Sequence, residues 1–309
     1  MDKVFIAGSA GTTGLRLRKR LESMPDVELL PVREELRKDP AEQKRLISLA
    51  DFVFLCLPDD AAREMAALAE GTGARVIDAS TAHRTSPGWA YGFPELSAEH
   101  RKAIETAACV ASPGCHASGF IALIYPLFAH GLLSKDALLS CTSLTGYSGG
   151  GKKMIAEYES AERSALLNGP KPYALSQSHK HLPEMGKQCG LLTPPVFMPV
   201  VGDFYSGMLV TVPLHGSELK GAPTAGELRA VYKEHYQSGL VQVMDEAPSA
   251  LYANALAGRD DMQLYVSGSD GRLLVSALFD NLGKGASGAA IQCFNLMRGA
   301  PEDAGLVRA

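Results

Sequence analysis

Short apolar runs alternate with amphipathic stretches through the first third of the chain. Residues 3–8 (KVFIAG), 50–58 and 74–80 (ARVIDAS) have the continuous apolar character of buried strands. Residues 15–24 and 59–73 have helical spacing of apolar positions. This alternation of strand and helix predicts a parallel sheet with helices on both faces.

The pattern continues with a helix at 100–107, a strand at 108–113 and an apolar helix at 114–133. Beyond these, strands are expected at 138–149, 207–216 and 272–282, and helices at 225–239 and 286–298. The expected class is α/β: a Rossmann-type doubly wound parallel sheet plus a mixed α+β substrate domain with a large sheet. The expected domains are 1–114, with the C-terminal helix 286–300 packing back on it, and 115–285. The substrate is expected in the cleft between them.

Three glycines separate the first strand from the first helix. Gly8, Gly11 and Gly14 lie at intervals of three residues in GSAGTTG. Gly8 permits a tight turn, Gly11 lets the backbone approach a pyrophosphate, and Gly14 lets the helix lie close to the strand. The helix N-terminus then offers free N–H groups to phosphates, so a dinucleotide site is predicted.

Arg33 ends the second strand-like run, VELLPV at 27–32. An acidic residue about 20 residues past the glycines would bind the ribose 2′-hydroxyl of NAD. Arginine there favours the 2′-phosphate of NADP. Glu34 and Glu35 follow directly, so a solvated charge cluster is the alternative reading.

Composition limits the kinds of partner. The chain has 309 residues, a net charge of −4 and six scattered cysteines without a CxxC pair. With no basic excess, a nucleic-acid partner is not expected. No signal peptide is recognised, and no apolar run approaches the roughly 20 residues that span a bilayer. The scattered cysteines argue against a disulfide framework and favour a reducing cytoplasm.

Cys115 follows Pro-Gly in VASPGCHASGF, where a loop becomes the apolar helix. A helix N-terminus stabilises a thiolate and lowers the cysteine pKa. Of the six cysteines only this one has such a setting, so Cys115 is the candidate nucleophile. A thiolate together with a dinucleotide site indicates oxidoreduction of an acyl phosphate or an aldehyde.

Two histidines supply candidates for acid–base chemistry. His179 and His181 alternate in YALSQSHKHLPEM, and in an extended segment they would face the same side. A surface histidine pair is the alternative. No third ligand is close in the sequence, so no metal site is predicted.

With these pieces in order, the chain resembles the N-acetyl-gamma-glutamyl-phosphate reductases, and most of all their shorter-chain form. The resemblance runs almost end to end. It rests on six segments in the same order: GSAGTTG, VIDAS followed by HR and YGFPEL, SPGCHASG, TGYSGGGKK, HKHLPEM and DNLGKGASGAAIQCFNLM. It implies NADPH-dependent reduction of N-acetyl-glutamyl 5-phosphate to the 5-semialdehyde and phosphate, a step of arginine biosynthesis.

The resemblance also implies roles for single residues. Cys115 would form a thioester, with His179, or in second place His181, as acid–base. The cofactor loop would comprise Gly8, Ala10, Gly11, Thr12, Thr13 and Gly14, with Arg33 at the 2′-phosphate and Asn281 near the nicotinamide. Candidate substrate contacts are Arg84, Ser148, Lys152 and Lys153; for the charged ones, solvated surface charge is the alternative.

Two other functions remain open at this point. A sister acyl-phosphate reductase, acting on an aspartyl or aminoadipyl substrate, would share the cysteine and the cofactor. A catalytically silent NADP-binding regulator would keep the fold without turnover. The expected partners are a small-molecule substrate and further copies of the chain, as a dimer or tetramer by resemblance, with no nucleic acid and no membrane.

Overall fold

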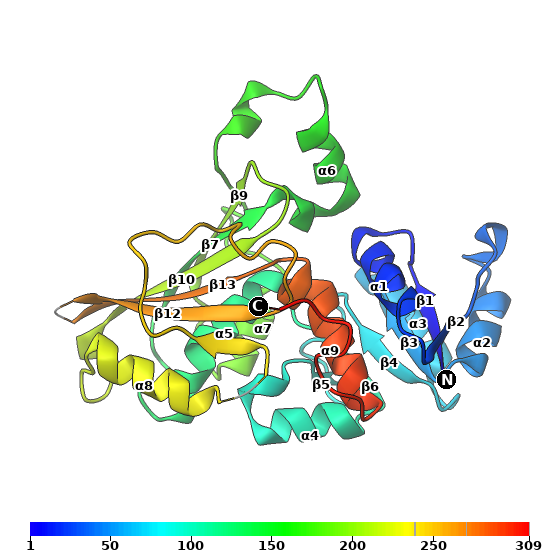
Figure 1. Cartoon of the computed structure of the whole chain (residues 1–309), viewed down its shortest axis with the longest axis horizontal. Helices are drawn as coiled ribbons and strands as arrows, with labels where there is room; N and C mark the ends of the chain where they lie inside the picture. The colour runs from blue at the N-terminus through cyan, green and yellow to red at the C-terminus, as the bar shows by residue number, and fades with distance from the viewer. Residues whose placement is uncertain (238, 270, 309) are drawn as a thin grey trace. The chain divides into compact units, whose positions relative to one another are not determined.

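The computed structural model describes residues 1–237, 239–269 and 271–308. The chain forms two compact units. Unit 1 comprises Met1–Gly114 and Ala286–Leu306, and unit 2 comprises Cys115–Gly285 with Val307–Ala309. Figure 1 shows the ribbon coloured along the chain.

Unit 1 contains a six-stranded sheet in the order β2-β1-β3-β4-β6-β5, and every neighbouring pair is parallel. Its strands are β1 Asp2–Ala7, β2 Val27–Leu29, β3 Phe52–Leu55, β4 Arg75–Asp78, β5 Ala90–Tyr91 and β6 Cys109–Ala111. Its helices are α1 Thr12–Glu22, α2 Pro40–Leu49, α3 Asp59–Ala69, α4 Ala98–Thr106 and α9 Gly288–Met297. The strand order changes direction beside β1, where doubly wound folds bind their ligands.

Side chains from alternate positions of these strands enter two separate cores. Val4 and Ile6 of β1 pack with apolar residues of α1, α4 and α9. Phe5 and Ala7 of the same strand pack with α2 and α3. Helices therefore cover both faces of the sheet, which explains why the strands read as continuous apolar runs. The predicted doubly wound sheet is confirmed.

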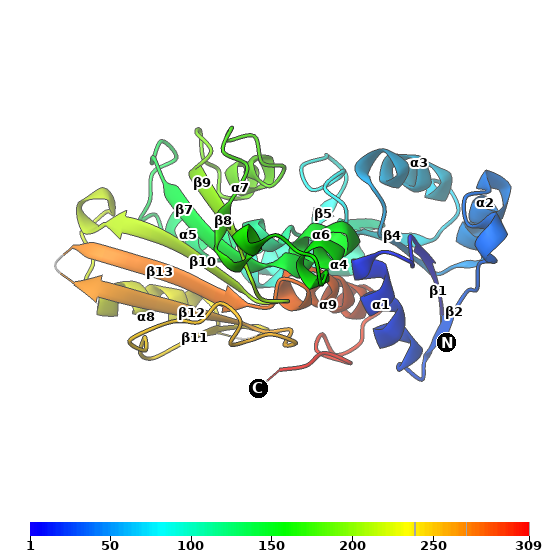
Figure 2. The ribbon, with the colours of Figure 1, turned by 90° about the horizontal axis from the view of Figure 1, so that it is seen from above.

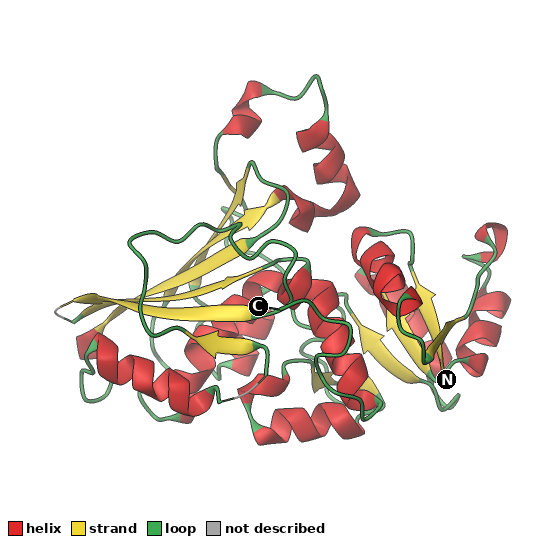
Figure 3. Ribbon diagram, viewed as in Figure 1, coloured by secondary structure: helices red, strands yellow, loops and turns green. Residues whose placement is uncertain are grey.

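Unit 2 contains a mixed seven-stranded sheet in the order β11-β12-β13-β10-β7-β9-β8, drawn in yellow in Figure 3. Its strands are β7 Ser140–Gly146, β8 Lys171–Pro172, β9 Val196–Gly202, β10 Met208–His215, β11 Val241–Val243, β12 Met262–Ser269 and β13 Arg272–Phe279. Its helices are α5 Cys115–Ala129, α6 Gly151–Glu159, α7 Leu182–Gln188 and α8 Ala225–His235. The predicted mixed domain with a large sheet is confirmed.

Helix α5 packs on β10 and β13, while α8 packs on β12 and touches α5. Figure 1 shows the segment that joins β7 to β8, with α6 in it, projecting beyond the ends of β7 and β9, and Figure 2 shows the same segment from above. The residues of β10 that face α5, among them Val210 and Val212, are fully buried. Eleven of the fifteen residues of α5 are buried as well, which explains its apolar sequence.

Some predicted elements differ from the structure. The helix expected at 225–239 ends at His235, and Ser238 lies outside the described residues. The expected loop at 80–96 contains the short strand β5. Helices α2 and α6 and strands β9 and β12 were not predicted.

Candidate functional site

Cys115 is the first residue of α5. Its side chain is partly exposed, at the positive end of a fifteen-residue helix. The helix dipole there favours the thiolate. By contrast, burial raises the pKa of the Cys56 thiol to about 12 and raises the pKa of the Cys141 and Cys189 thiols as well. The setting therefore distinguishes Cys115 from those three cysteines.

The backbone of Gly285 closes one side of the Cys115 position. A methyl group at Gly285 would lie 2.9 Å from Cys115 Cβ, 3.2 Å from the Asp280 carbonyl oxygen and 3.3 Å from the Phe279 ring. Gly285 belongs to a π-helical turn, Gly283–Ser287. Turns of this kind occur frequently at functional sites. The absence of a side chain at Gly285 thus leaves room for the nucleophile.

His116, the residue after Cys115, lies between two hydroxyl groups. Its Nδ1 is 2.7 Å from the Ser143 hydroxyl and its Nε2 is 2.8 Å from the Tyr173 hydroxyl. Burial, with added repulsion from His179 and Lys180, lowers the pKa of His116 to about 3. The imidazole is therefore neutral near pH 7.

His179 and His181 lie on a tight turn that leads into α7. The expected extended segment is wrong: His181 has helical backbone angles, and its N–H donates to His179 Nδ1 at 3.1 Å. The two rings are nevertheless adjacent, with centroids 4.7 Å apart, and each lies about 5.5 Å from the His116 ring. Burial lowers the pKa of His179 to about 4. Because Nδ1 accepts a hydrogen bond, neutral His179 carries its proton on Nε2.

His179 also lines a cavity of about 470 Å³. The other lining residues are Gln177, Ser178, Leu182, Pro183, Pro194, Pro195 and Val196. The walls are mainly apolar, which fits the low pKa of the imidazole. The cavity thus places one candidate acid–base residue beside a space of ligand size.

Asn281 and Ser148 are buried and bonded to one another. The Asn281 amide donates to the Ser148 hydroxyl at 3.1 Å, and its oxygen accepts the Gly207 N–H at 2.8 Å. These bonds hold the glycine-rich segment before α6. Lys152 and Lys153 lie in the first turn of α6 and are exposed.

The glycine loop of unit 1 has the geometry that a dinucleotide needs. Gly8 has a φ of +85°, and a Cβ there would lie 2.2 Å from the Cys56 carbonyl oxygen. A Cβ on Gly14 would lie 2.4 Å from the Gly8 carbonyl oxygen. Helix α1 begins after Gly11 with no side-chain cap and no acidic residue in its first turn. The buried Thr12 hydroxyl has no hydrogen-bond partner within the protein.

These features fit a bound pyrophosphate, which would take the free N–H groups of the helix N-terminus and the Thr12 hydroxyl. Thr13 follows in the first turn of α1, and Ala10 is exposed just before the helix. Arg33 is exposed beyond the end of β2.

Arg84 is placed differently from the other candidates. Its guanidinium is buried and donates to the backbone carbonyl of Ser112 at 2.9 Å and to that of Ala79 at 3.2 Å. These bonds tie the segment after β4 to the segment after β6. The structure therefore gives Arg84 a role in holding loops of unit 1.

His116, Tyr173 and Gly285 were not predicted as site residues. His116 had a local signal, because it adjoins the candidate nucleophile. The contact between Tyr173 and His116 had no local signal in the sequence, since 57 residues separate the two.

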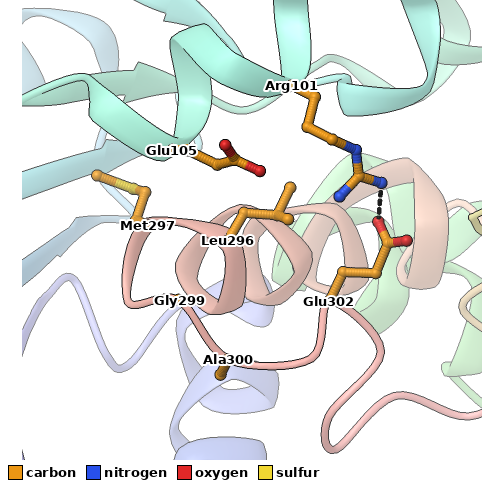
Figure 4. Close-up of a pocket in the computed structure, with 7 residues that line it drawn as sticks. All are labelled: Arg101, Glu105, Leu296, Met297, Gly299, Ala300 and Glu302. Carbon is orange, nitrogen blue, oxygen red and sulfur yellow. Dashed lines mark hydrogen bonds and ion pairs between the residues drawn. The ribbon is translucent and has the colours of Figure 1, made fainter. Parts of the chain in front are cut away.

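A separate pocket of about 470 Å³ lies in unit 1, between α4 and the end of α9. Figure 4 shows Arg101 and Glu302 joined across it by an ion pair of 2.7 Å. None of the predicted site residues lines it. Within the described ranges, no group of three or more His, Cys, Asp or Glu side chains is placed to hold a metal ion. Among the same residues, no helix is both long and apolar enough to cross a membrane.

Two family models match this chain. One, described as "Semialdehyde dehydrogenase, NAD binding domain", matches residues 3–104. The other, "Semialdehyde dehydrogenase, dimerisation domain", matches residues 115–281. Together with the glycine loop and Cys115, they define the class as semialdehyde dehydrogenases, enzymes with a nicotinamide-dinucleotide-binding domain.

Curated relatives narrow the family. N-acetyl-gamma-glutamyl-phosphate reductase 2 of Nostoc sp. is 42% identical over 98% of this chain and 99% of its own length. N-acetyl-gamma-glutamyl-phosphate reductase of Brucella ovis is 44% identical over 96% of this chain and 99% of its own length. The chain belongs to the N-acetyl-gamma-glutamyl-phosphate reductase family, which confirms the resemblance.

Solved structures with the same fold come from more distant proteins. Aspartate semialdehyde dehydrogenase II of Vibrio cholerae has a TM-score of 0.76 at 15% identity, covering 96% of this chain and 98% of that one. The enzyme of Francisella tularensis has a TM-score of 0.73 at 15% identity, covering 96% and 100%. At this identity the likeness shows the fold alone.

Proposed function

We propose that this chain reduces N-acetyl-gamma-glutamyl phosphate to N-acetylglutamate semialdehyde and phosphate, with NADPH, through a thioester on Cys115. The observation that supports this proposal most directly is the position of Cys115 at the start of α5, where the next residue, His116, contacts Tyr173 and His179. The names of the relatives at 42–45% identity supply the substrate. In this proposal unit 1 is the cofactor domain and unit 2 the substrate domain.

Cys115 acts as the nucleophile. Its thiolate attacks the acyl carbon, the bond to the phosphate oxygen breaks, and phosphate leaves with a proton taken from the site or from water. Backbone N–H groups at the start of α5 stabilise the oxyanion. When bound, the dinucleotide supplies the hydride that converts the thioester into the aldehyde, and the thiolate is released.

His179 acts on the acyl oxygen as a hydrogen-bond donor. The lowered pKa keeps it neutral at pH 7, and the bond to Nδ1 leaves its proton on Nε2. A neutral donor of this kind stabilises the developing oxyanion in both chemical steps. His181, on the same turn, is the second candidate.

Unit 1 is proposed to bind the cofactor through its phosphate groups. Gly8 to Gly14 would hold the pyrophosphate, and the exposed Arg33 would pair with the 2′-phosphate of NADP. Asn281 is proposed near the nicotinamide, where its bonds to Ser148 and Gly207 would fix the segment before α6.

The phosphate group of the substrate is proposed to bind at the start of α6. Lys152 and Lys153 lie in its first turn, no acidic residue accompanies them there, and no side chain caps the helix. Ser148 would position this segment through Asn281 rather than bind substrate alone. Arg84 would act through the loops that its guanidinium holds.

Assembly is part of the same proposal. Alternate residues of β9 on the sheet face opposite α5 are exposed, Val196 at 66% and Met198 at 47%, as is Leu274 of β13 at 44%. A second copy covering these residues would form the dimer that the domain description suggests. The six free cysteines support a reducing cytoplasm as the compartment.

The reverse reaction tests the function. Protein, N-acetylglutamate semialdehyde, phosphate and NADP are mixed, and NADPH formation is followed by absorbance. We expect phosphate-dependent turnover, with kcat/KM at least about tenfold lower for the aspartate and aminoadipate semialdehydes. Cys115→Ala should bind cofactor without turnover. A preference for another semialdehyde would identify a sister reductase, and cofactor binding without any turnover would identify a silent regulator.

A further inference from the structure

A histidine and a buried carboxylate form a pair at the end of β4 that the proposed mechanism does not use. Asp78 is the last residue of β4 and is fully buried. Its Oδ2 lies 2.6 Å from His83 Nδ1, and its two oxygens accept the N–H and the hydroxyl of Ser80 at 2.8 Å each. The His83 ring stacks on the Trp89 ring, with centroids 3.9 Å apart and planes 8° from parallel. The imidazole is therefore held at one edge and on one face.

The loop that carries His83 is itself tied to other parts of unit 1. The Thr81 N–H donates at 3.1 Å to the carboxylate of Asp59, the first residue of α3, and the Thr81 hydroxyl donates to the same carboxylate. The Arg84 guanidinium joins the loop to the segment after β6. A loop held in this way presents a side chain in one position, which recognition of a ligand requires.

The Asp78 carboxylate determines which ring nitrogen remains for a ligand. A carboxylate accepts hydrogen bonds and donates none, so Nδ1 of His83 carries a hydrogen, and Nε2 of the neutral ring is an acceptor. Among the residues that the structure describes, none bonds to this Nε2, and the His83 side chain is 11% exposed. The ring thus offers one open acceptor while a buried carboxylate fixes its tautomer, an arrangement typical of functional histidines.

A second polar group on the same edge of the sheet also lacks a partner. Ser112 directly follows β6 and is 1% exposed, and its hydroxyl has no hydrogen-bond partner within the described part of the chain. Its N–H donates to the Asp78 carbonyl at 2.7 Å, so the ends of β4 and β6 lie together. A buried hydroxyl without a partner costs free energy, and a ligand that bonds to it removes this cost.

The strand order places His83 in the path of the dinucleotide. Because all six strands are parallel, the glycine loop after β1, Arg33 after β2 and His83 after β4 follow the same, carboxyl edge of the sheet. With the pyrophosphate at the start of α1 and the 2′-phosphate at Arg33, the adenosine half extends over β2. The nicotinamide half then extends to the other side of β1, over β3 and β4. Two strand spacings, about 10 Å, separate β1 from β4, which a ribose and a ring span together.

We propose that His83 binds the nicotinamide half of NADP, with Nε2 accepting a hydrogen bond from a donor of that nucleotide. The donor is a ribose hydroxyl or the carboxamide N–H. Asp78 fixes the tautomer that makes Nε2 an acceptor, and Trp89 supports the ring from one face. The inference rests on the proposed function in one respect, that unit 1 binds NADP.

The test measures binding rather than turnover, by isothermal titration calorimetry of the whole chain with three ligands. NADP contains the complete nicotinamide nucleotide, 2′-phospho-ADP-ribose lacks the ring, and 2′-phospho-ADP lacks both the ring and its ribose. His83→Asn keeps a side-chain N–H near the Nδ1 position, where it can bond to Asp78, and removes Nε2. We expect this variant to raise the Kd for NADP about fivefold and to leave the Kd for 2′-phospho-ADP unchanged, because one hydrogen bond is lost.

The intermediate ligand identifies the donor. If the Kd for 2′-phospho-ADP-ribose rises with that for NADP, the donor is a ribose hydroxyl, and if it stays at the wild-type value the donor is the carboxamide. His130→Asn, at an exposed histidine just after α5, is the matched control and should bind all three ligands as the wild type does.

Trp89 gives a second readout, because it is the only tryptophan in the sequence and stacks on His83. We expect NADP to change the tryptophan emission of the wild-type protein and 2′-phospho-ADP to leave it unchanged. Equal changes for the two ligands would place the nicotinamide half elsewhere and overturn the inference. If His83→Asn fails to fold, this comparison decides.

The outcomes also separate this inference from the proposed function. If the wild type binds NADP and His83→Asn binds it equally well, the role of His83 is overturned while unit 1 remains the cofactor domain. Equal losses of affinity for all three ligands would mean that His83 only holds its loop, which overturns the inference as well. A wild-type protein that binds none of the ligands would overturn both proposals.

Discussion

The reactivity of Cys115 depends on residues that leave space as much as on residues that bond. At Gly285, the Cβ atom of any side chain would lie 2.9 Å from the Cβ atom of Cys115. One helical turn along α5, a methyl group on Gly119 would meet Val210 at 2.4 Å. The first turn of α5 is therefore fixed on the sheet through glycine contacts, and its register determines where the sulfur lies.

Gly285→Ala tests this dependence. The added methyl group has backbone and ring atoms on its other sides, so we expect Cys115 to shift and kcat to fall at least about tenfold, with KM for the cofactor little changed. Steady-state kinetics measures both. Gly226→Ala, in α8, is the control, because the nearest atom to its new methyl group is 4.0 Å away. Equal activity of the two variants would remove Gly285 from the site.

At the scale of elements, α5 contains a proline, and the helical hydrogen bond that this proline removes is replaced by a side chain from the end of α8. Pro126 has no N–H, so the Ala122 carbonyl four residues earlier loses its helical donor. The Tyr236 hydroxyl, just after α8, donates to that carbonyl at 2.9 Å, and the Tyr232 hydroxyl donates to the Leu123 carbonyl. Tyr236 thus satisfies the one backbone carbonyl that the proline leaves without a helical donor.

Tyr236→Phe is expected to lower the free energy of unfolding by about 1 kcal/mol, since a buried carbonyl loses its donor. Denaturant titration measures the change. Tyr252→Phe, at a side chain that is 71% exposed, should have no effect. Equal stability of Tyr236→Phe and wild type would show that the carbonyl is satisfied in another way.

The elements also explain what the sequence could predict. Strands of unit 1 are covered on both faces and read as apolar runs, so β1, β3 and β4 were found. Strand β9 buries one face and exposes Val196 and Met198 on the other, and it was missed. Cys115 could be predicted as the nucleophile because Pro-Gly precedes it and an apolar helix follows it in the sequence. The contact of His116 with Tyr173 depends on tertiary packing, which no local pattern encodes.

For the whole molecule, a buried neutral histidine has a thermodynamic consequence. Below pH 6.5 the unfolded chain binds a proton at His116 that the folded chain excludes down to a pKa of about 3. Its contribution to stability is complete above about pH 6.5 and is lost progressively as the pH falls through this window.

We expect the wild-type free energy of unfolding to fall more steeply than that of His116→Gln between pH 6 and 4, by about 1.4 kcal/mol per pH unit. Urea titrations at several pH values measure both slopes. His130→Gln, at an exposed histidine, should keep the wild-type slope. Parallel slopes for wild type and His116→Gln would mean that His116 titrates normally in the folded state.

The central claim concerns the whole molecule as a catalyst: Cys115 accepts the acyl group from the phosphate. The direct measurement is the mass of the protein after mixing with N-acetyl-gamma-glutamyl phosphate in the absence of dinucleotide. We predict an N-acetylglutamyl adduct on the Cys115 peptide, absent from Cys115→Ser and discharged as aldehyde when NADPH is added. Turnover without such an adduct, or an adduct on another residue that NADPH discharges, would contradict the account.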